Sequence, residues 1–507
     1  MARRDPRAPC LIGVGRRTWH PADVGAEGAP EPLSMWETVA RAAADDSGAP
    51  AALEAIESLQ VIYCQSFDYD DPAGRLADRL GAEPRDRRYT GIGGSVPQTT
   101  VADLAAGILT GGLDLALVVG AEALATRRAM KKAGHKPDWS HPAAERRPFP
   151  FDAPFHPAEL ANSVLQAYLT FALFDSARRA HRSVPLGEHR EHLGRLLAPM
   201  TEVAAADPAD AWFPVARSAA ELTDATAGNR MVAFPYTKLM VSIMDIDMAA
   251  ALLIASDEMA DRLGVPADRR VYLRGWGYGQ DPHYVAERRE LWRSPAMKVA
   301  SGAALAGAGV GIDDIAHLDL YSCFASSIAF AGDALGLDAA EIEARHRSVT
   351  VTGGLPYHGG PGSNYMTHAL AALAERLRGD PGSFGLASGV GMHMTKHAFG
   401  LWSTEPGPVV PPDQAALDRA VAADLEVAAI TDSVDDATEG TVAAYTVLHG
   451  RDGAGEWGSL VCDLADGTRC YARLEDEEAL AQAEREELIG RTVTLSPADG
   501  GVNLARL

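Results

Sequence analysis

Two glycine-rich stretches of the sequence decide its fold. Residues 353–365 read G-G-L-P-Y-H-G-G-P-G-S-N-Y, and residues 89–98 read Y-T-G-I-G-G-S-V-P-Q. A helical run begins at or near the end of each stretch, at Asn364–Arg378 and at Gln98–Leu109 respectively. Because the same order of glycine turn and helix occurs twice, these stretches predict an internal repeat.

The neighbouring segments repeat in the same way. A helix is expected from Ser34, where S-M-W-E forms a capping box with Glu37, and another from Ser294, where Pro295 suits the first helical turn. Strand-like apolar runs occur at equivalent places in the two halves: Leu11–Gly15, Leu59–Cys64 and Leu115–Val119, then Val271–Gly275, Leu318–Cys323 and Phe384–Ala387. The pattern therefore predicts two α/β halves with mixed sheets and buried strands.

Breaks in this pattern predict the domain boundaries. The segment between the halves carries amphipathic runs such as Leu160–Arg182, which predict a helical insertion. Later, E-P-G-P-V-V-P-P-D-Q contains four prolines, which predict a stiff linker. The expected units are an N-terminal half at residues 1–120, the insertion at 121–236, a C-terminal half at 237–404, the linker at 405–414 and a further domain at 415–507.

The segment after the linker has the element order of a small β-barrel. Strands are expected at Thr441–Leu448, Ser459–Leu464 and Cys470–Leu474. A charged helix at Glu477–Ile489 follows, and then two strands around residues 498–501. Three strands, a helix and two strands form the order of an OB-type barrel. The acidic balance of this segment favours docking on the rest of the chain over binding of a nucleic acid.

Composition excludes several classes of function. The chain has 507 residues, with 69 acidic and 46 basic side chains, a formal net charge of −23 and a pI near 5.0. This charge argues against a nucleic-acid or anionic-membrane partner. Five cysteines in so long a chain indicate a reducing compartment. We find no signal-peptide core and no apolar stretch of membrane-spanning length, so we expect a cytoplasmic protein.

The repeated halves, the insertion and the glycine turns resemble the thiolase superfamily. With G-V-G-M-H-M-T-K-H at residues 389–397, they resemble in particular the bacterial thiolase-like proteins, usually labelled acetyl-CoA acetyltransferases, that carry an extra C-terminal barrel domain. The resemblance covers nearly the whole chain. It implies a five-layered α-β-α-β-α fold that takes a coenzyme A thioester as substrate or ligand, with no tightly bound cofactor. Thiolases generally dimerise, so a homodimer is one expectation, although the fused barrel could mask that surface.

The sequence departs from a working thiolase at each catalytic position. The turn that holds the cysteine nucleophile reads Gly94-Ser95, and the G-H-P turn that holds the base reads Gly359-Gly360-Pro361. Ala387 stands where the second cysteine is expected, and Tyr321-Ser322 occupies the oxyanion position. The resemblance therefore implies acyl-CoA binding without the usual Cys-His-Cys chemistry.

Several residues could replace that chemistry. Ser95, at the start of a buried helix, could act as a nucleophile, although serine is also the ordinary residue at a helix N-cap. His358 and His393, with His397 nearby, could act as bases near neutral pH, although a histidine in such a segment often serves only as a hydrogen-bond partner. His393 and His397 have the spacing of metal ligands on a helix, but no carboxylate lies between them, so we expect no metal site.

The tyrosines near the glycine turns suggest a different reaction. Relatives within the superfamily cleave β-hydroxy-acyl-CoA thioesters by retro-aldol chemistry, using tyrosines and an OB-like barrel partner protein. Tyr321 and Tyr365 are the favoured equivalents here, with Tyr357 as a third. A tyrosine can hold the proton of the β-hydroxyl group or stabilise an enolate. The alternative is that these rings only pack against the glycine turns. Cys323 is a minor candidate nucleophile, because most lone intracellular cysteines are small buried hydrophobic residues.

A basic run stands out in this acidic chain. Arg127, Arg128 and Lys131 lie in the insertion, where the family binds its nucleotide, and they could bind the phosphates of coenzyme A. A solvated helix face is the alternative.

Three functions remain open at this stage. The first is an acyl-CoA-binding protein of the acyltransferase family, with a role in lipid or acyl-CoA metabolism. The second is a thiolase-fold retro-aldol lyase that uses tyrosines. The third is a non-catalytic CoA-binding scaffold whose barrel recruits a partner.

Overall fold

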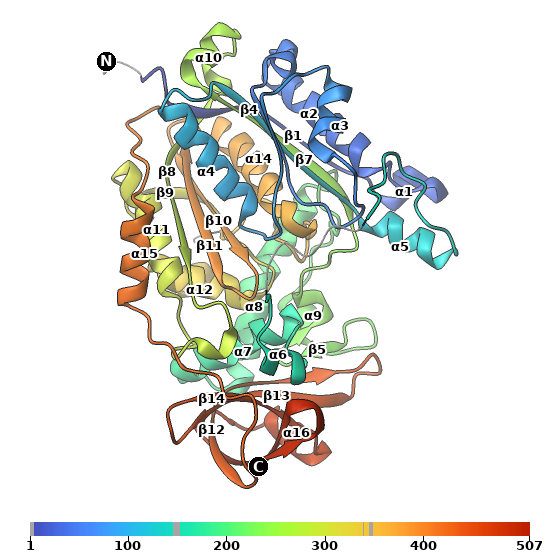
Figure 1. The fold of residues 1–507 in the computed structure, drawn as a ribbon, viewed down its shortest axis with the longest axis vertical. Coiled ribbons are helices and arrows are strands. Elements are labelled where there is room, and N and C mark those ends of the chain that lie inside the picture. The colour runs from blue at the N-terminus through green and yellow to red at the C-terminus, as the bar shows by residue number, and fades with distance from the viewer. Residues whose placement is uncertain (1–4, 146–152, 338, 344–347) are drawn as a thin grey trace.

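A computed structural model describes residues 5–145, 153–337, 339–343 and 348–507. Two α/β halves fill the upper part of the molecule in Figure 1, and a β-barrel that contains the C-terminus lies below them. Most of the insertion helices lie between the halves and the barrel, whereas the helix at Leu124–Lys132 (α5) lies beside the first half. Among the described helices, none is long and apolar enough to cross a membrane.

The first half contributes five strands, which pair in the order β3-β2-β4-β7-β1. Strand β2 runs parallel to β3 and β4, whereas β7 runs antiparallel to both β4 and β1. Every residue of β4 and β7 is buried, as expected for strands covered on both faces. The strands are β1 (Pro9–Thr18), β2 (Ser58–Val61), β3 (Asp86–Tyr89), β4 (Leu115–Ala123) and β7 (Asp247–Ser256).

The second half repeats this arrangement. Its strands pair in the order β8-β11-β10-β9, with β9 parallel to β10 and β11 antiparallel to both of its neighbours. The two halves join in one nine-stranded sheet where Cys10 and Leu11 pair with Tyr272 and Val271. These pairings confirm the predicted repeat. The strands are β8 (Val271–Gln280), β9 (Ile315–Asp319), β10 (Phe384–Gly391) and β11 (Lys396–Ser403).

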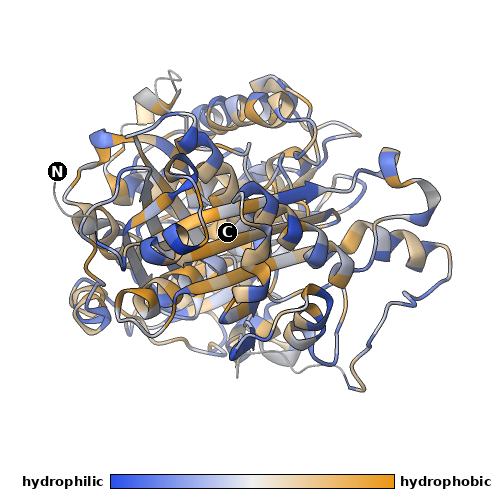
Figure 2. Ribbon diagram, turned by 90° about the horizontal axis from the view of Figure 1, so that it is seen from above, coloured by the Kyte–Doolittle hydropathy of each residue, from blue (hydrophilic) through white to orange (hydrophobic). Residues whose placement is uncertain are grey.

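Helices complete five layers, as the resemblance implied. Helices α4 (Val96–Leu109) and α14 (Tyr365–Arg378) pack on each other between the halves, and each contacts strands of both. The outer layers are α2 (Pro32–Asp46) and α3 (Pro72–Leu80) on the first half, and α11 (Pro295–Ala308) and α12 (Ala325–Leu335) on the second. Figure 2 shows that the hydrophobic ribbons gather in the middle of the molecule.

The two expected helix starts have different outcomes. Ser294 accepts a hydrogen bond from the Met297 N–H and caps α11, as predicted. The prediction at Ser34 is wrong, because α2 already begins at Pro32, after Glu31. Proline fixes the backbone angle that a first helical turn needs, and this places the N-cap of α2 three residues earlier than predicted.

Glycines let the outer helices lie directly on the sheet in both halves. A Cβ atom on Gly13 of β1 would lie 2.0 Å from the carbonyl oxygen of Ala43 in α2. On Gly277 of β8, the same atom would lie 2.1 Å from the carbonyl oxygen of Ala300 in α11. Any larger residue at these places would push the helix away from the strand.

The insertion is not wholly helical, which corrects one expectation. It ends in the hairpin β5 (Met231–Ala233) and β6 (Tyr236–Thr237), and β5 pairs with β12 of the barrel. The predicted boundary at residue 236 therefore falls inside a hairpin that extends the C-terminal sheet. The predicted C-terminal half at 237–404 also begins too early, because β7 pairs between β4 and β1 in the first half. Its helices are α5 (Leu124–Lys132), α6 (Pro157–Ala161), α7 (Ala167–His181), α8 (Leu186–Ala206) and α9 (Ala219–Thr223).

The C-terminal strands form a closed barrel in the predicted element order. Closure follows from β12, which pairs with both β13 and β15. The helix between the third and fourth strands is shorter than expected and ends at Ala483. The elements are β12 (Thr438–His449), β13 (Gly455–Leu464), β14 (Arg469–Leu474), α16 (Glu477–Ala483), β15 (Thr492–Ala498) and β16 (Val502–Arg506).

Four other helices complete the described chain. After the proline-rich segment, α15 packs on β8 and α11 of the second half rather than on the barrel. The four helices are α1 (Pro21–Val24), α10 (Asp257–Arg262), α13 (Ala339–Glu343) and α15 (Gln414–Ala423).

Buried polar contacts fix the barrel to the rest of the protein. The Tyr471 hydroxyl donates to Oε1 of Glu159 at 2.8 Å and accepts from the Ala286 N–H at 2.8 Å. Arg469 donates to the carbonyl oxygens of Arg288 and Arg289. Because Tyr471 is fully buried, water cannot replace its hydrogen bonds.

We expect Tyr471→Phe to destabilise the protein by about 1–3 kcal/mol, because it leaves the buried Ala286 N–H without its partner and removes one of the hydrogen bonds that Glu159 accepts. Thermal unfolding of the full chain measures the change. Tyr284→Phe is the control, since the Tyr284 hydroxyl donates to the Ala153 carbonyl oxygen at an exposed position. Equal melting temperatures for the two variants would contradict this account of the barrel interface.

Candidate functional site

Ser95 lies directly before α4, as the sequence predicted. Its side chain is 3% exposed and makes no capping hydrogen bond. Its backbone is in the right-handed helical region, whereas a capping residue is normally extended. Ser95 therefore holds the N-cap position, but its side chain does not cap the helix. Pro97 lies in the first turn of α4, as expected.

Tyr321 covers the first glycine turn. A Cβ atom on Gly94 would lie 2.1 Å from the Tyr321 hydroxyl oxygen and 2.4 Å from the Val390 carbonyl oxygen. One on Gly389 would lie 2.9 Å from the Cα atom of Ser95. The structure thus brings together two predicted site residues, Ser95 and Tyr321, with the last glycine turn. Among the described residues, no hydrogen bond is made by the Tyr321 hydroxyl.

The positions of the other thiolase catalytic groups hold no reactive side chain. A Cβ atom on Gly360 would lie 2.2 Å from Oγ of Ser242 and 3.3 Å from the Ile243 carbonyl oxygen. The segment that contains Ser242 and Ile243 therefore takes the space of the missing histidine. Ala387 is fully buried inside β10.

Tyr365 is engaged in a buried network. Its hydroxyl donates to Oδ1 of Asp319 at 2.9 Å and lies 2.7 Å from the hydroxyl of Thr352. Burial and the adjacent Asp319 hold its pKa well above the ordinary value. The ring meets Tyr321 edge to face, with centroids 5.6 Å apart. The two favoured tyrosines are neighbours, and of these two only Tyr365 makes a hydrogen bond through its hydroxyl within the described residues. Tyr357 is fully buried, and its hydroxyl has no partner among the described residues.

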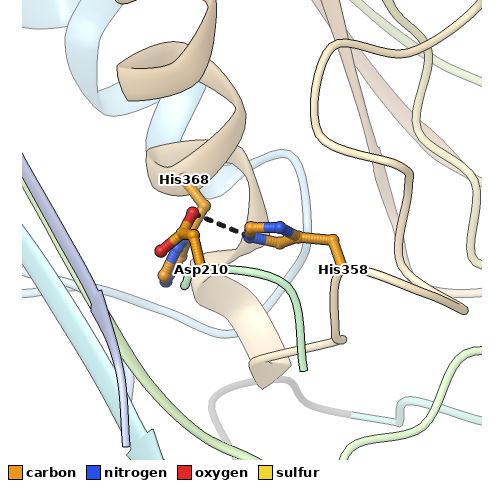
Figure 3. A group of neighbouring side chains, drawn as sticks. All are labelled: Asp210, His358 and His368. Atoms are coloured by element: carbon orange, nitrogen blue, oxygen red, sulfur yellow. Dashed lines mark ion pairs between the residues drawn. The ribbon is translucent and has the colours of Figure 1, made fainter. Parts of the chain in front are cut away.

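His358 belongs to a cluster that the sequence did not reveal. Its Nε2 atom lies 3.7 Å from Oδ2 of Asp210, and its ring centroid lies 5.4 Å from that of His368 (Figure 3). Burial lowers the pKa of both imidazoles, to about 3 for His368, so both are neutral near pH 7. His368 follows the second glycine stretch by one helical turn, which was a weak sign that it lies near the site. Asp210 lies in the insertion, and nothing in the sequence indicated that it does so too.

His393 and His397 lie apart from this cluster. Nδ1 of His393 is 2.8 Å from the Thr170 hydroxyl, and burial lowers its pKa to about 4. Nε2 of His397 is 3.0 Å from Oδ2 of Asp281. Arg288 lies between them, since it donates to the His393 carbonyl oxygen and approaches Asp281. The partners of His393 and His397 are different from those of His358, and the pair does not share a helix, because β11 begins at Lys396.

The candidate cysteine is partly buried and the basic run is exposed. Burial raises the pKa of Cys323 to about 12, so its thiol is protonated near pH 7. Arg127, Arg128 and Lys131 are exposed on α5. Arg127 donates to the Gln65 carbonyl oxygen, and Arg128 pairs with Asp245.

A cavity of about 370 Å³ opens beside Ser95. Trp276, Phe399 and the side chain of Lys396 contribute to its wall. Gln98 also lines the cavity, and both polar atoms of its buried amide lack a partner among the described residues. An apolar wall with one unsatisfied amide suits a small organic ligand.

The comparisons agree with this architecture. The profile described as thiolase-like protein type 1 additional C-terminal domain matches residues 416–500. The crystal structure of a monomeric SCP2-thiolase-like protein type 1 from Mycobacterium smegmatis is 30% identical, covers 100% of both chains and has a TM-score of 0.84. The chain belongs to the thiolase-like protein type 1 family.

Two thiolase-fold structures of lower identity share only the fold. The Ltp2-ChsH2(DUF35) aldolase is 16% identical, with a TM-score of 0.60, over 79% of this chain and 99% of that one. The Acat5 thiolase from Ascaris suum in complex with coenzyme A is 12% identical, with a TM-score of 0.53, over 78% and 99%. No curated protein matches the sequence.

Glu122 is a buried acid that the sequence analysis of this thiolase-like protein type 1 missed. It accepts hydrogen bonds from the N–H groups of Gln65 and Ser66. It also lies against the second glycine stretch, since a Cβ atom on Gly362 would lie 2.7 Å from its Oε1 atom. Burial raises the pKa of Glu122 from 4.5 to about 7.

This pKa makes stability depend on pH. Between pH 4.5 and 7 the unfolded chain releases the proton of Glu122 while the folded protein retains it, so the free energy of unfolding falls as pH rises. We expect Glu122→Gln to remove this pH dependence. Between pH 4.5 and 7, the free energy of unfolding of the variant should therefore rise by up to about 3 kcal/mol relative to that of the natural protein.

Chemical denaturation at several pH values measures this difference between variant and natural protein. Glu54→Gln, at an exposed position, is the control and should follow the natural protein at every pH. A constant difference between Glu122→Gln and the natural protein from pH 4.5 to 8 would contradict the assignment.

Proposed function

We propose that this protein binds coenzyme A thioesters without forming a covalent acyl-enzyme. The observation that carries the proposal is the occupied catalytic centre: the Tyr321 hydroxyl lies over Gly94, and Ser242 takes the space beside Gly360. Membership of the thiolase-like protein type 1 family and the coenzyme A bound to the Ascaris thiolase of the same fold support the choice of ligand.

In the described part of the chain, the site does not pair a nucleophile with a base, as covalent acyl transfer requires. A serine nucleophile needs a base within hydrogen-bond reach. Among the described residues, the Ser95 hydroxyl has no histidine as hydrogen-bond partner, and His358 faces Asp210 and His368 instead. The protonated thiol of Cys323 is 3.8 Å from the Ser327 hydroxyl and is a poor nucleophile.

Cationic side chains for the phosphates of coenzyme A occur in two places. The first is the exposed face of α5 with Arg127 and Lys131, which we favour because it follows directly from β4 of the first half. The second is a cavity of about 930 Å³ between α7 and the barrel, whose wall includes Arg289 and Arg485. In that cavity Asp463 accepts from Arg289 at 3.0 Å and offsets part of the charge.

Intact-mass spectrometry after incubation with acetyl-CoA and acetoacetyl-CoA tests the proposal. We expect no acyl adduct, together with saturable binding of coenzyme A measured by calorimetry. Because each phosphate contact is charge-assisted, we expect the double variant Arg127→Glu/Lys131→Glu to weaken binding at least about tenfold.

The double variant Arg289→Glu/Arg485→Glu reverses two charges in the cavity between α7 and the barrel and should leave coenzyme A binding unchanged. If this double variant weakens binding and the α5 variant does not, the assignment of the phosphates to α5 is wrong. An adduct that peptide mapping places on Ser95 or Cys323 would overturn the proposal itself.

A second candidate is retro-aldol cleavage of a β-hydroxy-acyl-CoA. The free hydroxyl of Tyr321 and the fused barrel favour it, and one structure of the same fold is named an aldolase. In this reaction the bond between Cα and Cβ breaks, Cβ becomes a ketone carbonyl, and the β-hydroxyl proton is lost while Cα gains one. Burial holds the pKa of Tyr321 above its ordinary value, so this tyrosine would donate a hydrogen bond to the enolate oxygen.

For the lyase, we expect Tyr321→Phe to lower the rate by about 10²–10³, the usual effect of losing one oxyanion donor. Liquid chromatography with mass spectrometry would follow the ketone and the shortened thioester. Tyr445→Phe, a buried tyrosine of the barrel, is the control. Equal rates for the natural protein and Tyr321→Phe would contradict this role, and coenzyme A binding without any turnover would favour the scaffold.

The edge strand β3 indicates whether two copies of the chain could pair through the nine-stranded sheet. Strand β3 lies at one edge of the nine-stranded sheet and reads D-R-R-Y, with Arg87 and Arg88 exposed. Charged residues on a short edge strand oppose pairing with a second copy. This edge and the monomeric Mycobacterium relative favour a monomer over the homodimer that the resemblance implied.

A further inference from the structure

Three side chains from distant parts of the sequence meet in the interior of the protein. Asp210 comes from the insertion, His358 from the second glycine stretch and His368 from the first turns of α14. Figure 3 shows the carboxylate of Asp210 next to the imidazole rings, with its ion pair to His358 drawn as a dashed line. One ligand atom of each residue lies within 4.8 Å of the other two, and all three residues are buried.

Three imidazole nitrogens of this cluster make no hydrogen bond within the described residues. They are Nε2 of His358 and both ring nitrogens of His368, and all three are buried from solvent. An unsatisfied buried polar atom costs about 1–3 kcal/mol. Buried groups of this kind call for an explanation, and a bound ion is one of the recognised explanations.

The surrounding charges favour a doubly charged cation. Arg16 contacts Asp210, Asp207 and Glu375, so three carboxylates face one guanidinium. The three carboxylates and the one guanidinium carry a combined charge of about −2, which one divalent cation would balance. The guanidinium does not exclude a cation, because a carboxylate that binds a metal is commonly held by a further hydrogen bond.

The backbone around the cluster is already ordered. The Trp212 N–H donates to the His358 carbonyl oxygen at 2.7 Å, and the Phe213 N–H donates to the Tyr357 carbonyl oxygen at 3.0 Å. The Thr18 hydroxyl also donates to the Asp210 carbonyl oxygen. These bonds join the loop of Asp210 to the turn of His358, so only side-chain rotation is needed to change the separation of the three ligand atoms.

We propose that Asp210, His358 and His368 bind one divalent transition-metal ion. Two neutral imidazole nitrogens and one carboxylate oxygen form a ligand set that suits Zn²⁺, Fe²⁺ or Co²⁺ and does not suit Ca²⁺ or Mg²⁺, which prefer oxygen ligands. Bonds of about 2.1 Å require ligand atoms roughly 3.4 Å apart in a tetrahedral site, so the cluster contracts when the ion binds.

The site lies next to the tyrosines of the candidate centre. The ring of His358 is 6.2 Å from that of Tyr365, which in turn meets Tyr321. The metal proposal does not depend on coenzyme A binding. If the protein binds the metal but does not bind coenzyme A, only the proposed function is contradicted.

The test uses the full chain without a polyhistidine tag, because a tag would itself bind metal. After treatment with a chelator, the protein is titrated with ZnCl₂ in competition with a chromogenic chelator, and its metal content is measured by inductively coupled plasma mass spectrometry. We expect one Zn²⁺ per chain. CoCl₂ should give a visible d–d spectrum without the charge-transfer band of a thiolate ligand, which separates this site from the cysteines.

Variants locate the ion. We expect His368→Gln and Asp210→Asn each to weaken Zn²⁺ binding at least about tenfold, whereas His317→Gln, a histidine outside the cluster that pairs with Asp380, should leave it unchanged. Circular dichroism checks that each variant is folded. If a variant does not fold, the Co²⁺ spectrum of the natural protein decides the question.

Two results would overturn the proposal. The first is a natural protein that binds less than about one tenth of an equivalent of Zn²⁺ and gives no Co²⁺ spectrum. The second is unchanged Zn²⁺ affinity in a folded His368→Gln or Asp210→Asn variant.

Discussion

The packing of α4 against α14 between the two sheets is the constraint on which the rest of this structure depends. Both helices are covered by strands of both halves, and α14 is buried along ten consecutive residues from Tyr365 to Ala374. The repeat places the N-termini of the two helices together, and the Gly93 N–H donates to the Ser363 hydroxyl at 3.0 Å across that junction. The glycine turns exist because neither helix could otherwise begin so close to the other.

The candidate site shows how a fold can persist while its chemistry changes. The fold needs small residues at the helix starts, but it does not need a cysteine or a histidine there. Once those side chains are lost, the space does not stay empty, because an unfilled cavity costs packing energy. Tyr321 and Ser242 lie in that space, and the buried polar contacts nearby are those of Tyr365 with Asp319 and of His358 with Asp210.

The barrel is integrated with the insertion rather than tethered to it. The β5–β6 hairpin extends the barrel sheet, and Tyr471 joins β14 to Glu159 and to the backbone of Ala286. Such buried polar contacts fix the orientation of two domains, because each one loses its hydrogen bonds if the surfaces slide. The proline-rich linker ends at α15, and α15 packs on the second half and not on the barrel.

The resemblance implied the five layers and the candidate roles of Ser95, Tyr321 and Tyr365. The sequence by itself determined the repeat and the element order of the barrel. These follow from local rules, since glycine turns, apolar strands and helix starts are written in neighbouring residues. It did not determine that Asp210 meets His358 and His368, that His393 and His397 lie apart from them around Arg288, or that β5 joins the barrel. Only the tertiary structure decided these contacts, because they join residues far apart in the chain, and such contacts have no periodic signature in the sequence.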